Sequence, residues 1–483
     1  MEHIVLLTGR LAQPALERVL AGMAPAPFTW EVREIGLQVA GLMTADMIRR
    51  RVPAPIVADR ILVPGRCRGD LDALSAHFGV PVERGPAELK DIPRHFNRSA
   101  SAGRLDAYDI DIFAEIVDAP RLDVVEIVER ARRLAADGAN VIDIGCLPAT
   151  PFPQLEDAVA ALKAEGFRVS VDSQDADELL RGGRAGADYL LSLTVDTLWI
   201  ADEVASTPVL IPREPGDEDS LYAAIATLAR HGRPFLADAI LDPIPFGLLG
   251  SLCRYQRLRE RFPDVAIMMG IGNVTELTEA DTSGINAVLF GIAAELRASA
   301  VLTTQVSQHA RRAVREADVA RRVMYEARES GSLPKGITDE LMTVHAKHPF
   351  PDTPEEIHAT ACAVRDPSFR VQVSPLGLHI YNRDGHHVDT DPFALYPRLD
   401  LEGDAGHAFY LGVELARAEI AWSLGKRYAQ DQPLDWGCAT ERRADDLMRQ
   451  CAPGPTKKSR AAAAQAVDPT PNPSHRAPEV ASQ

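Results

Sequence analysis

The sequence predicts an α/β fold with a closed (β/α)₈ barrel at its centre and a smaller domain on either side. Strand and helix patterns alternate eight times over about 220 residues, which is what such a barrel requires. The segments before and after this region differ from it in composition and pattern. A doubly wound open sheet is the alternative, but open sheets rarely sustain eight uninterrupted repeats.

The pattern is clearest in the stretch Phe167–Thr194. Val169 and Val171 alternate with polar residues, so one face of this strand is apolar and the other ends in the carboxylate of Asp172. Acidic and polar residues then mark a helix start, and a glycine-rich run leads into a second strand, Tyr189–Leu193. Two strands joined by a helix make a parallel pair that helices must cover.

The remaining strands and helices follow the same order along the chain. Besides the two strands above, we expect strands at Ile110–Val117, Asn140–Gly145, Val209–Ile211, Phe235–Asp242, Ala266–Gly270 and Val301–Thr304. We expect the other helices at Val124–Asp137, Leu155–Glu165, Asp196–Val204, Asp219–His231, Leu248–Arg261, Asp281–Leu296 and Gln308–Ser330.

The flanking segments predict two further domains and a tail. The expected division is 1–105 as a small Rossmann-like α/β domain, 106–330 as the barrel, 331–451 as an α+β domain and 452–483 as a disordered tail. In the third segment, the turn Asn382–Gly385 between Val-, Ile- and Tyr-rich flanks predicts a hairpin, and a helix follows from Ala408 to about Tyr428.

Composition excludes several classes of partner. The formal charge of −17 argues against nucleic acid or an anionic membrane. The start of the chain lacks a signal-peptide pattern, and no apolar run reaches the roughly 18 residues of a membrane helix. The six cysteines never form C-x-x-C, which fits a reduced compartment. We therefore expect a soluble, cytoplasmic protein.

Alternation along the strands selects candidate site residues. Residues that point out of a barrel meet helices and should be apolar, so Asp143, between two isoleucines, points inward, as does Asp172. In the sixth strand, Asp238 and Asp242 share one face. Several carboxylates therefore converge at one mouth of the barrel, and burying them costs several kcal/mol each unless a partner is present.

Polar residues on other strands extend this set. The fourth strand contributes Ser192 inward, and the eighth contributes Thr303 or Thr304. Asn273 fits a substrate contact and a capping box with Glu276 about equally well.

Two further groups of residues suggest ligands less directly. Arg10, Arg66 and Arg68 accompany turns before helices of the first domain and could bind an anion, although ordinary strand–helix turns are favoured. Six histidines lie between His345 and His387, and surface or packed histidines are favoured over a metal site. His386 and its neighbour, being adjacent on a strand, point to opposite sides. Metal ligands stay unassigned.

Three short motifs carry a resemblance to a known family. The segment Ile240-Leu241-Asp242-Pro243, followed by Phe246-Gly247, resembles the I-L-D-P-x-x-x-F-G motif of dihydropteroate synthases. Val171-Asp172-Ser173 is similar to that family's V-D-T, and Gly272-Asn273-Val274 to a stretch of the related corrinoid methyltransferases. In these pterin-binding barrels the matching Asp and Asn residues contact the pterin. The resemblance thus implies a pterin site, with Asp172 and Asp242 as the residues central to catalysis.

The resemblance is incomplete at the diphosphate half of the site. Dihydropteroate synthases carry a Lys after strand seven and an Arg-x-His on strand eight, where this chain has Gly270–Asn273 and Leu302–Gln305. Ser192 replaces the family's usual Asn on strand four. The resemblance therefore implies that the anion is bound from elsewhere, by an arginine of the first domain, or that the reaction differs.

The three-part build resembles the dihydropteroate synthase-related proteins of organisms that make tetrahydromethanopterin. This implies a transferase that joins a dihydropterin-6-methyl diphosphate to an arylamine, a ribosyl-aminobenzene phosphate, with Mg²⁺ as the expected cofactor. The alternatives are methyl transfer from a methyl-tetrahydropterin to a corrinoid partner and a non-catalytic pterin-binding subunit. A homodimer is left open.

Overall fold

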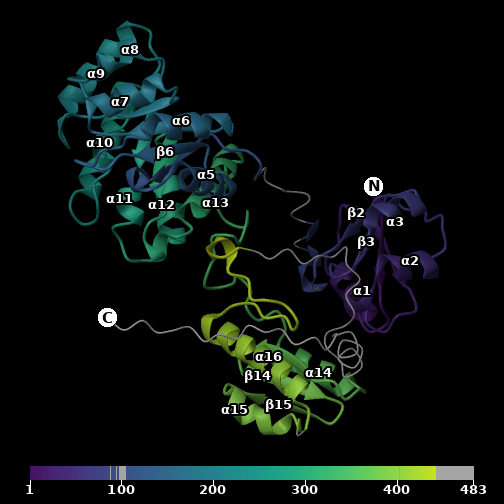
Figure 1. Cartoon of the computed structure of the whole chain (residues 1–483). Coiled ribbons are helices and arrows are strands. Elements are labelled where there is room, and N and C mark those ends of the chain that lie inside the picture. The colour runs from purple at the N-terminus through teal and green to yellow at the C-terminus, as the bar shows by residue number, and fades with distance from the viewer. Residues whose placement is uncertain (88, 94, 97–104, 402, 442–483) are drawn as a thin grey trace, which may run out of the picture. The chain divides into compact units, whose positions relative to one another are not determined.

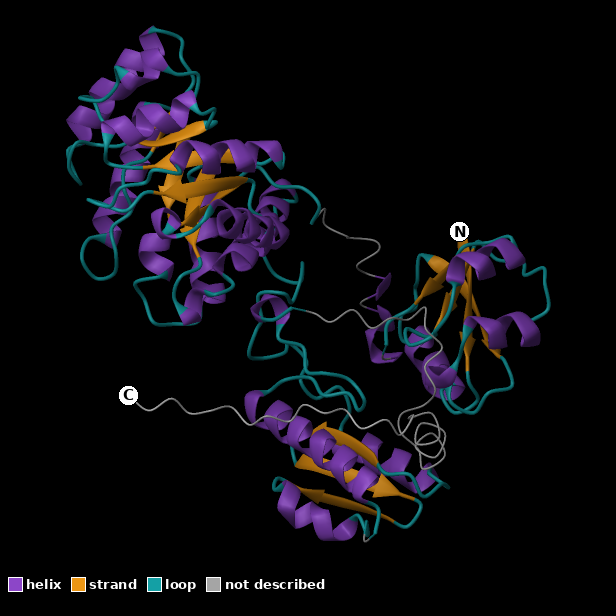
Figure 2. Ribbon diagram, viewed as in Figure 1, coloured by secondary structure: helices purple, strands orange, loops and turns teal. Residues whose placement is uncertain are grey.

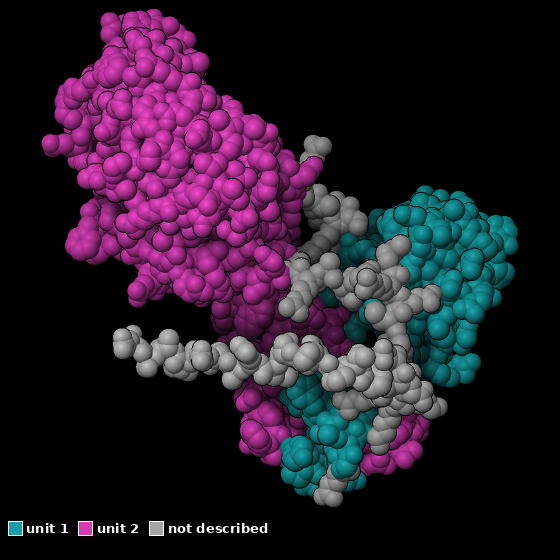
Figure 3. Space-filling model, viewed as in Figure 1, with its two compact units in different colours: residues 1–101, 396–414, 443–483 teal, residues 102–395, 415–442 magenta. Residues whose placement is uncertain are grey.

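The computed structural model describes residues 1–87, 89–93, 95–96, 105–401 and 403–441. Two compact units share these residues, the first with 1–101 and 396–414 and the second with 102–395 and 415–442, as Figure 3 colours them. The expected tail at 452–483 lies outside the described residues. The division into three domains and a tail stays a prediction.

The N-terminal segment forms a parallel four-stranded sheet in the order β2-β1-β3-β4. Its strands are β1 (Glu2–Thr8), β2 (Phe28–Glu34), β3 (Arg60–Val63) and β4 (Val82–Arg84), and its helices are α1 (Gln13–Ala21), α2 (Ala45–Arg51) and α3 (Leu71–Phe78) (Figure 1). Val5 and Leu7 belong to one apolar cluster, and Ile4 and Leu6 to another. Because successive residues of β1 enter different clusters, both faces of this sheet are buried, as is usual for parallel sheets.

Eight parallel strands close into a barrel surrounded by helices (Figure 2), which confirms the predicted fold class. The strands are β5 (Asp111–Ile116), β6 (Val141–Gly145), β7 (Arg168–Asp172), β8 (Tyr189–Leu193), β9 (Thr207–Leu210), β10 (Leu236–Ala237), β11 (Ala266–Gly270) and β12 (Ala300–Thr304). The helices are α5 (Val124–Asp137), α6 (Leu155–Ala164), α7 (Ala176–Arg184), α8 (Ile200–Glu203), α9 (Glu218–Arg230), α10 (Leu248–Arg261), α11 (Gly272–Thr275), α12 (Thr282–Glu295) and α13 (Ala313–Glu329). Pairing of β12 with β5 completes the ring.

Alternation along the strands produces two apolar layers. Phe113, Val141 and Leu191 belong to the cluster inside the barrel. Their neighbours in sequence, such as Ile112 and Ile142, belong to the large cluster between strands and helices. Residues that share the parity of the first group therefore point into the barrel, and at the C-terminal strand ends they reach its mouth.

The sixth strand departs from the prediction. A strand was expected over Phe235–Asp242, but β10 comprises only Leu236–Ala237. The chain leaves the extended conformation because Ile240 has a φ of 61°, in the left-handed region. A β-branched side chain is rarely found there, so the position is strained, and such strain often marks functional segments. The expected helix at Asp196–Val204 is likewise shorter, as α8.

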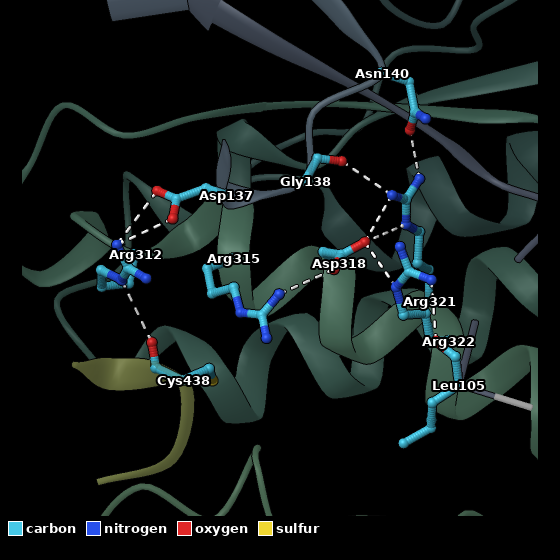
Figure 4. Close-up of polar contacts among 10 residues, drawn as sticks. All are labelled: Leu105, Asp137, Gly138, Asn140, Arg312, Arg315, Asp318, Arg321, Arg322 and Cys438. Atoms are coloured by element: carbon cyan, nitrogen blue, oxygen red, sulfur yellow. Dashed lines mark hydrogen bonds and ion pairs between the residues drawn. The ribbon is translucent and has the colours of Figure 1, made fainter. Parts of the chain in front are cut away.

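A buried arginine joins the last barrel helix to the first two strands (Figure 4). The Arg321 guanidinium donates to the Asp318 carboxylate at 2.7 and 3.0 Å. It also donates to the carbonyls of Ile110 and Gly138 at 2.8 and 2.9 Å and to the side-chain oxygen of Asn140. Both charged side chains are nearly inaccessible, with 1% and 6% exposure. A buried ion pair is tolerated when hydrogen bonds satisfy its remaining donors and acceptors, as they do for the Arg321 guanidinium.

The C-terminal segment contains an antiparallel sheet in the order β13-β14-β15. Its elements are α14 (Pro354–Ala363), β13 (Arg370–Ser374), β14 (Gly377–Asn382), β15 (Gly385–Asp389), α15 (Pro392–Leu395) and α16 (Ala405–Leu424). Pairing of Asn382 with Gly385 confirms the predicted hairpin turn. Among the described residues, no helix combines the length and apolar character needed to cross a membrane.

Candidate functional site

Three carboxylates from consecutive strands meet at the C-terminal mouth of the barrel. Glu115 on β5 stands beside Asp143 on β6, and Asp172 ends β7 beside Gly145. Glu115, Asp143 and Asp172 each place a carboxylate oxygen within 4.8 Å of the others. The inward prediction for Asp143 and Asp172 is therefore confirmed by the geometry, and Glu115 joins them.

A glycine makes room for this carboxylate cluster. A Cβ atom on Gly145 would lie 2.5 Å from Oε1 of Glu115 and 3.0 Å from the Cα of Val117. Real Cβ atoms do not approach other atoms so closely, so only glycine allows the Glu115 carboxylate to lie across the end of β6.

The cluster strongly disfavours full ionisation. Burial raises the pKa of Glu115 to about 8, and the charges of Asp172 and Glu276 add to the effect. Burial, and then the charge of Glu115, likewise raises the pKa of Asp143 to about 8. The pKa of Asp172 is raised by burial and by the charges of Asp143 and Asp238. At neutral pH the cluster therefore retains protons, because like charges in a site of low polarity oppose one another.

The fully buried Asp143 is only half satisfied. Its Oδ1 accepts a hydrogen bond from the Ser170 hydroxyl, while Oδ2 has no partner in the structure. A buried carboxylate oxygen without a donor is costly. Three carboxylates around one point match the oxygen ligands that Mg²⁺ prefers. Glu115, Asp143 and Asp172 are thus suited to hold either shared protons or a divalent cation.

A cavity of about 570 Å³ opens beside the carboxylate cluster. Glu115, Asp172 and Glu178 line it together with the loop 146–151. Cys146 also lines it, but burial and the neighbouring Glu178 raise the pKa of its thiol far above the ordinary range. The thiol stays protonated, so Cys146 does not supply a nucleophile. The carboxylates, and not the cysteine, are therefore the candidate reactive groups of this cavity.

Asp238 lies near the cluster and is firmly held. Its Oδ1 accepts hydrogen bonds from the Tyr255 hydroxyl and, at 2.7 Å, from the backbone N–H of Ile240. Burial raises the pKa of Asp238 to about 6, although these hydrogen bonds oppose the shift. Its charge acts on Asp172. With two protein donors on one oxygen, Asp238 positions the strained segment after β10.

Asp242 belongs to a hydrogen-bonded group, separate from the carboxylate cluster, that is centred on Arg254 of α10. Arg254 donates to Oδ2 of Asp242 at 2.8 Å and to the carbonyls of Ile240 and Ala239 at 2.8 and 3.2 Å. The Asn273 side chain donates to the Leu241 carbonyl at 2.8 Å. Arg254 thus holds the segment 239–242 in its irregular path. A carboxylate offers about four acceptor positions, so Asp242 retains capacity for a ligand.

Strand pairing decides between Thr303 and Thr304 and leaves the orientation of Ser192 open. Thr303 pairs with Ala114 and Thr304 with Glu115, and Ala114 belongs to the helix-facing layer. Thr303 therefore faces the helices, and Thr304 takes the inward place. On β8 the pairing with β9 shifts register after Leu191, so the regular alternation used to place Ser192 fails there. The binding role of Ser192 stays a prediction.

Glu276 does not form the capping box considered for Asn273. Its carboxylate instead accepts hydrogen bonds from the N–H groups of Val306 and Ser307 at 2.7 and 2.9 Å and from the Thr304 hydroxyl at 3.1 Å. Burial alone would raise the pKa of Glu276, but these bonds outweigh it and lower the pKa. Glu276 therefore stays anionic and fixes the chain after β12 next to the mouth.

Of the predicted anion-binding arginines, Arg66 lines a cavity in the N-terminal sheet unit. The volume of this cavity is about 300 Å³, and Thr8 also lines it. Arg10 and Arg68 are not among its lining residues. The anion role of these three arginines stays a prediction.

The barrel itself has an arginine-rich groove, which also contains carboxylates, that the sequence did not reveal. A groove of about 920 Å³ begins at Glu115 and continues along α5 and the segment after β12. Its arginines are Arg121, Arg130, Arg133, Arg311 and Arg312. Arg130 pairs with Asp118 and Arg312 with Asp137, whereas Arg121 and Arg133 are exposed and have no ion pair among the described residues.

Sequence comparisons match a family model and a relative. A family model described as a family of unknown function (DUF6513) matches residues 2–87. An uncharacterized protein of Methanocaldococcus jannaschii is 25% identical to this chain over 89% of it and 98% of the relative.

Solved dihydropteroate synthases resemble about half of the chain. That of Yersinia pestis with a pterine-sulfa conjugate has 17% identity and a TM-score of 0.36, covering 47% of this chain and 95% of the synthase. That of Burkholderia cenocepacia with 7,8-dihydropteroate has 16% identity and a TM-score of 0.36, covering 46% and 92%. Likenesses at this level concern the fold alone.

Proposed function

We propose that this protein is a pterin-binding transferase that joins a dihydropterin-6-methyl diphosphate to an arylamine, as dihydropteroate synthases do. The observation that carries the proposal is the convergence of Glu115, Asp143 and Asp172 beside a cavity of about 570 Å³ at the barrel mouth. Barrel enzymes place their active sites at this end. The V-D-S motif supplies Asp172, which lines this cavity. The I-L-D-P motif supplies Asp242, which Arg254 holds after β10.

The aminopyrimidinone edge of a pterin presents an N–H and an NH₂ side by side. A carboxylate accepts such a fork through both oxygens, and Asp242 is proposed for this contact, with Arg254 holding it in place. Asp172 faces the cavity and is proposed to orient the pterin ring. Positioning of the methylene carbon then allows the C–O bond to the diphosphate to ionise while the arylamine nitrogen attacks.

Charge on the leaving diphosphate requires compensation. Mg²⁺, held by Glu115, Asp143 and Asp172, would neutralise part of that charge. The groove with Arg121 and Arg133 starts at Glu115 and suits the anionic end of either substrate. We propose that this groove binds the diphosphate in place of the Lys and Arg-x-His of dihydropteroate synthases, which this chain lacks. The ribosyl-aminobenzene phosphate of tetrahydromethanopterin synthesis is the proposed arylamine.

The test is incubation of the full chain with dihydropterin diphosphate, Mg²⁺ and candidate arylamines, followed by mass detection of the adduct. Asp172→Asn should lower adduct formation by about 100-fold or more, since it alters the side chain proposed to orient the pterin ring and to hold the cation. The matched control, Asp202→Asn, alters an exposed carboxylate on α8 and should leave the rate unchanged.

Two results would contradict this function. Tight pterin binding without any adduct would make the chain a binding subunit, and methyl transfer to a corrinoid without any adduct would make it a methyltransferase.

A further inference from the structure

The N-terminal sheet reverses its strand order at β1. The chain passes from β1 to β2 on one side and then returns across β1 to β3 on the other, which gives the order β2-β1-β3-β4. In parallel α/β sheets such a switch point opens a crevice outside the carboxyl ends of the strands, and ligands bind there. Pairing of β1 with β3 extends only to Leu6 and Leu62, whereas β1 itself continues to Thr8. The two strands therefore separate at this edge.

The loops that follow the strands form two fixed sides of this crevice. On one side, the Arg10 N–H after β1 donates to the Leu37 carbonyl after β2 at 2.7 Å. On the other side, the Gly85 N–H after β4 donates to the Val63 carbonyl at the end of β3 at 2.8 Å. Because backbone hydrogen bonds hold each pair of loops together, the crevice is formed before any ligand arrives, as most small-molecule sites are.

A cavity of about 300 Å³ occupies the crevice. Residues that follow each of the four strands contribute to its lining: Ala12, 39–41, Pro64 and 85–87. Most of the remaining lining is aliphatic, and Leu6, Leu16 and Leu62 also belong to the apolar cluster between the sheet and α1. A cavity of roughly 150 Å³ with such walls holds one benzene ring. The cavity in the crevice therefore has room for an apolar body of one or two rings.

Among the described residues that line the cavity, two have polar side chains, Thr8 and Arg66. Thr8 is only 2% exposed and shares the parity of Leu6, so its side chain lies on the cavity side of the sheet. The described part of the chain gives the Thr8 hydroxyl no hydrogen-bond partner. A buried hydroxyl without a partner is costly, so Thr8 suits a ligand that supplies a donor or an acceptor.

Arg66 supplies the positive charge of the cavity. Its side chain reaches across the crevice, because a Cβ on Gly41 in the loop after β2 would lie 4.0 Å from the Arg66 Cδ. Arg66 already takes part in an interaction within the chain. A guanidinium has five N–H donors, however, and binds a carboxylate or a phosphate through two of them. The cavity thus combines apolar walls with one cationic group.

The N-terminus of α1 does not offer the phosphate site that Rossmann folds have at this place. The N–H groups of Ala12 and Gln13 both donate to the Gly9 carbonyl at 3.1 Å, and Pro14 has no N–H. Gly9 itself serves the packing of the loops, because a Cβ there would lie 2.7 Å from the backbone nitrogen of Ala40. Since the chain uses these N–H groups itself, the negative charge of a ligand is matched by Arg66.

We propose that this switch-point cavity binds a small organic anion whose apolar part consists of one or two rings. The rings pack on Leu6 and Leu62, and the anionic group accepts two N–H bonds from Arg66. The Thr8 hydroxyl bonds to a polar atom of the ring system. Carboxylate and phosphate groups both match a guanidinium, so either can be the anionic group. This role does not rest on the transferase reaction, because the cavity belongs to the N-terminal sheet unit alone.

Fluorescence titration of the full chain with 2-naphthoate and with 2-naphthyl phosphate tests the site. Both probes are two-ring anions, and the tighter of the two shows whether the preferred group is a carboxylate or a phosphate. The neutral 2-naphthamide should bind at least about 10-fold more weakly, because it lacks the charge-assisted hydrogen bonds of Arg66. Arg66→Gln should weaken binding of the preferred anion by about 10- to 100-fold, and Thr8→Val, which keeps the shape, by about 3- to 10-fold.

Hydrogen exchange of the full chain locates the bound probe. Peptides that cover 8–12, 39–41, 64–66 and 85–87 should become protected, and peptides of the barrel should not. Arg18→Gln, an exposed change on α1, is the matched control and should bind like the unaltered protein.

Four results would overturn the proposal. The amide binds as tightly as the anions, a folded Arg66→Gln protein binds them unchanged, or protection appears at the barrel instead of the four loops. The fourth is the absence of binding at probe concentrations up to about 1 mM.

Discussion

Replacing Glu115 by Gln tests the electrostatics of the barrel mouth. The pKa of Glu115 is about 8 in the folded protein against an ordinary value of 4.5, and that of Asp143 is about 8 against 3.8. Between about pH 4 and pH 8, Glu115 and Asp143 are protonated in the folded state but ionised in the unfolded state. These carboxyl groups therefore impose no penalty below about pH 4, and the stability of the barrel falls as pH rises toward 8.

The magnitude follows from the number of protons involved. Each such group lowers the free energy of unfolding by about 1.4 kcal/mol per pH unit inside this window. Glu115→Gln removes one of these groups and also the charge that adds to the raised pKa of Asp143, so the loss of one group's share of the slope is the least change expected. The variant should thus show a slope shallower by at least about 1.4 kcal/mol per pH unit and be the more stable protein at the upper end of the window.

Hydrogen exchange of peptides from β5 and β6 measures this slope for the barrel alone, after correction for the intrinsic pH dependence of exchange. The samples contain chelator, because a bound cation would replace the shared protons. Glu129→Gln, an exposed change on α5, is the control and should keep the original slope. Equal slopes for Glu115→Gln and the unaltered protein would refute the assigned pKa shifts.

Two further predictions concern other parts of the barrel. Asp242→Asn should lower pterin affinity by about 30- to 1000-fold in a fluorescence titration. Asp238→Asn should mainly lower the stability of the fold, since the Asp238 carboxylate accepts two internal hydrogen bonds. Similar losses of pterin affinity in both variants would contradict these separate roles. Asp318→Ala should cost about 3–5 kcal/mol in urea unfolding because Arg321 is left buried and unpaired. Asp109→Ala breaks a partly exposed ion pair with Arg328 and should cost under about 1 kcal/mol.

Alternation in the sequence was sufficient to find the barrel and two members of the carboxylate cluster. It could also have identified Glu115, which shares the parity of Phe113, while Ile112 and Ala114 face the helices. The signal was present, because Glu115 alternates with apolar neighbours in the same way as Asp143 does. Its contact with Asp143 depends on strand register, which a single strand does not specify.

Other errors came from places where local pattern is ambiguous. Val301 and Leu302 are both apolar, so parity along β12 could not decide between Thr303 and Thr304. The early end of β10 depends on Ile240, whose left-handed conformation opposes its intrinsic preference and is maintained by Arg254 from a helix 14 residues further along the chain. Such long-range constraints override local propensity.

The hold of Arg254 on the segment 239–242 has a consequence for the kinetics of ligand capture. Fixing one residue's backbone costs roughly 1–2 kcal/mol of conformational entropy, and here that cost has been met during folding. A ligand that meets Asp242 encounters a receptor that is already ordered, so association should approach the rate of diffusional encounter and differences in affinity should arise in dissociation. Loosening Arg254 would transfer the ordering step to the moment of binding and slow capture without removing a single ligand contact.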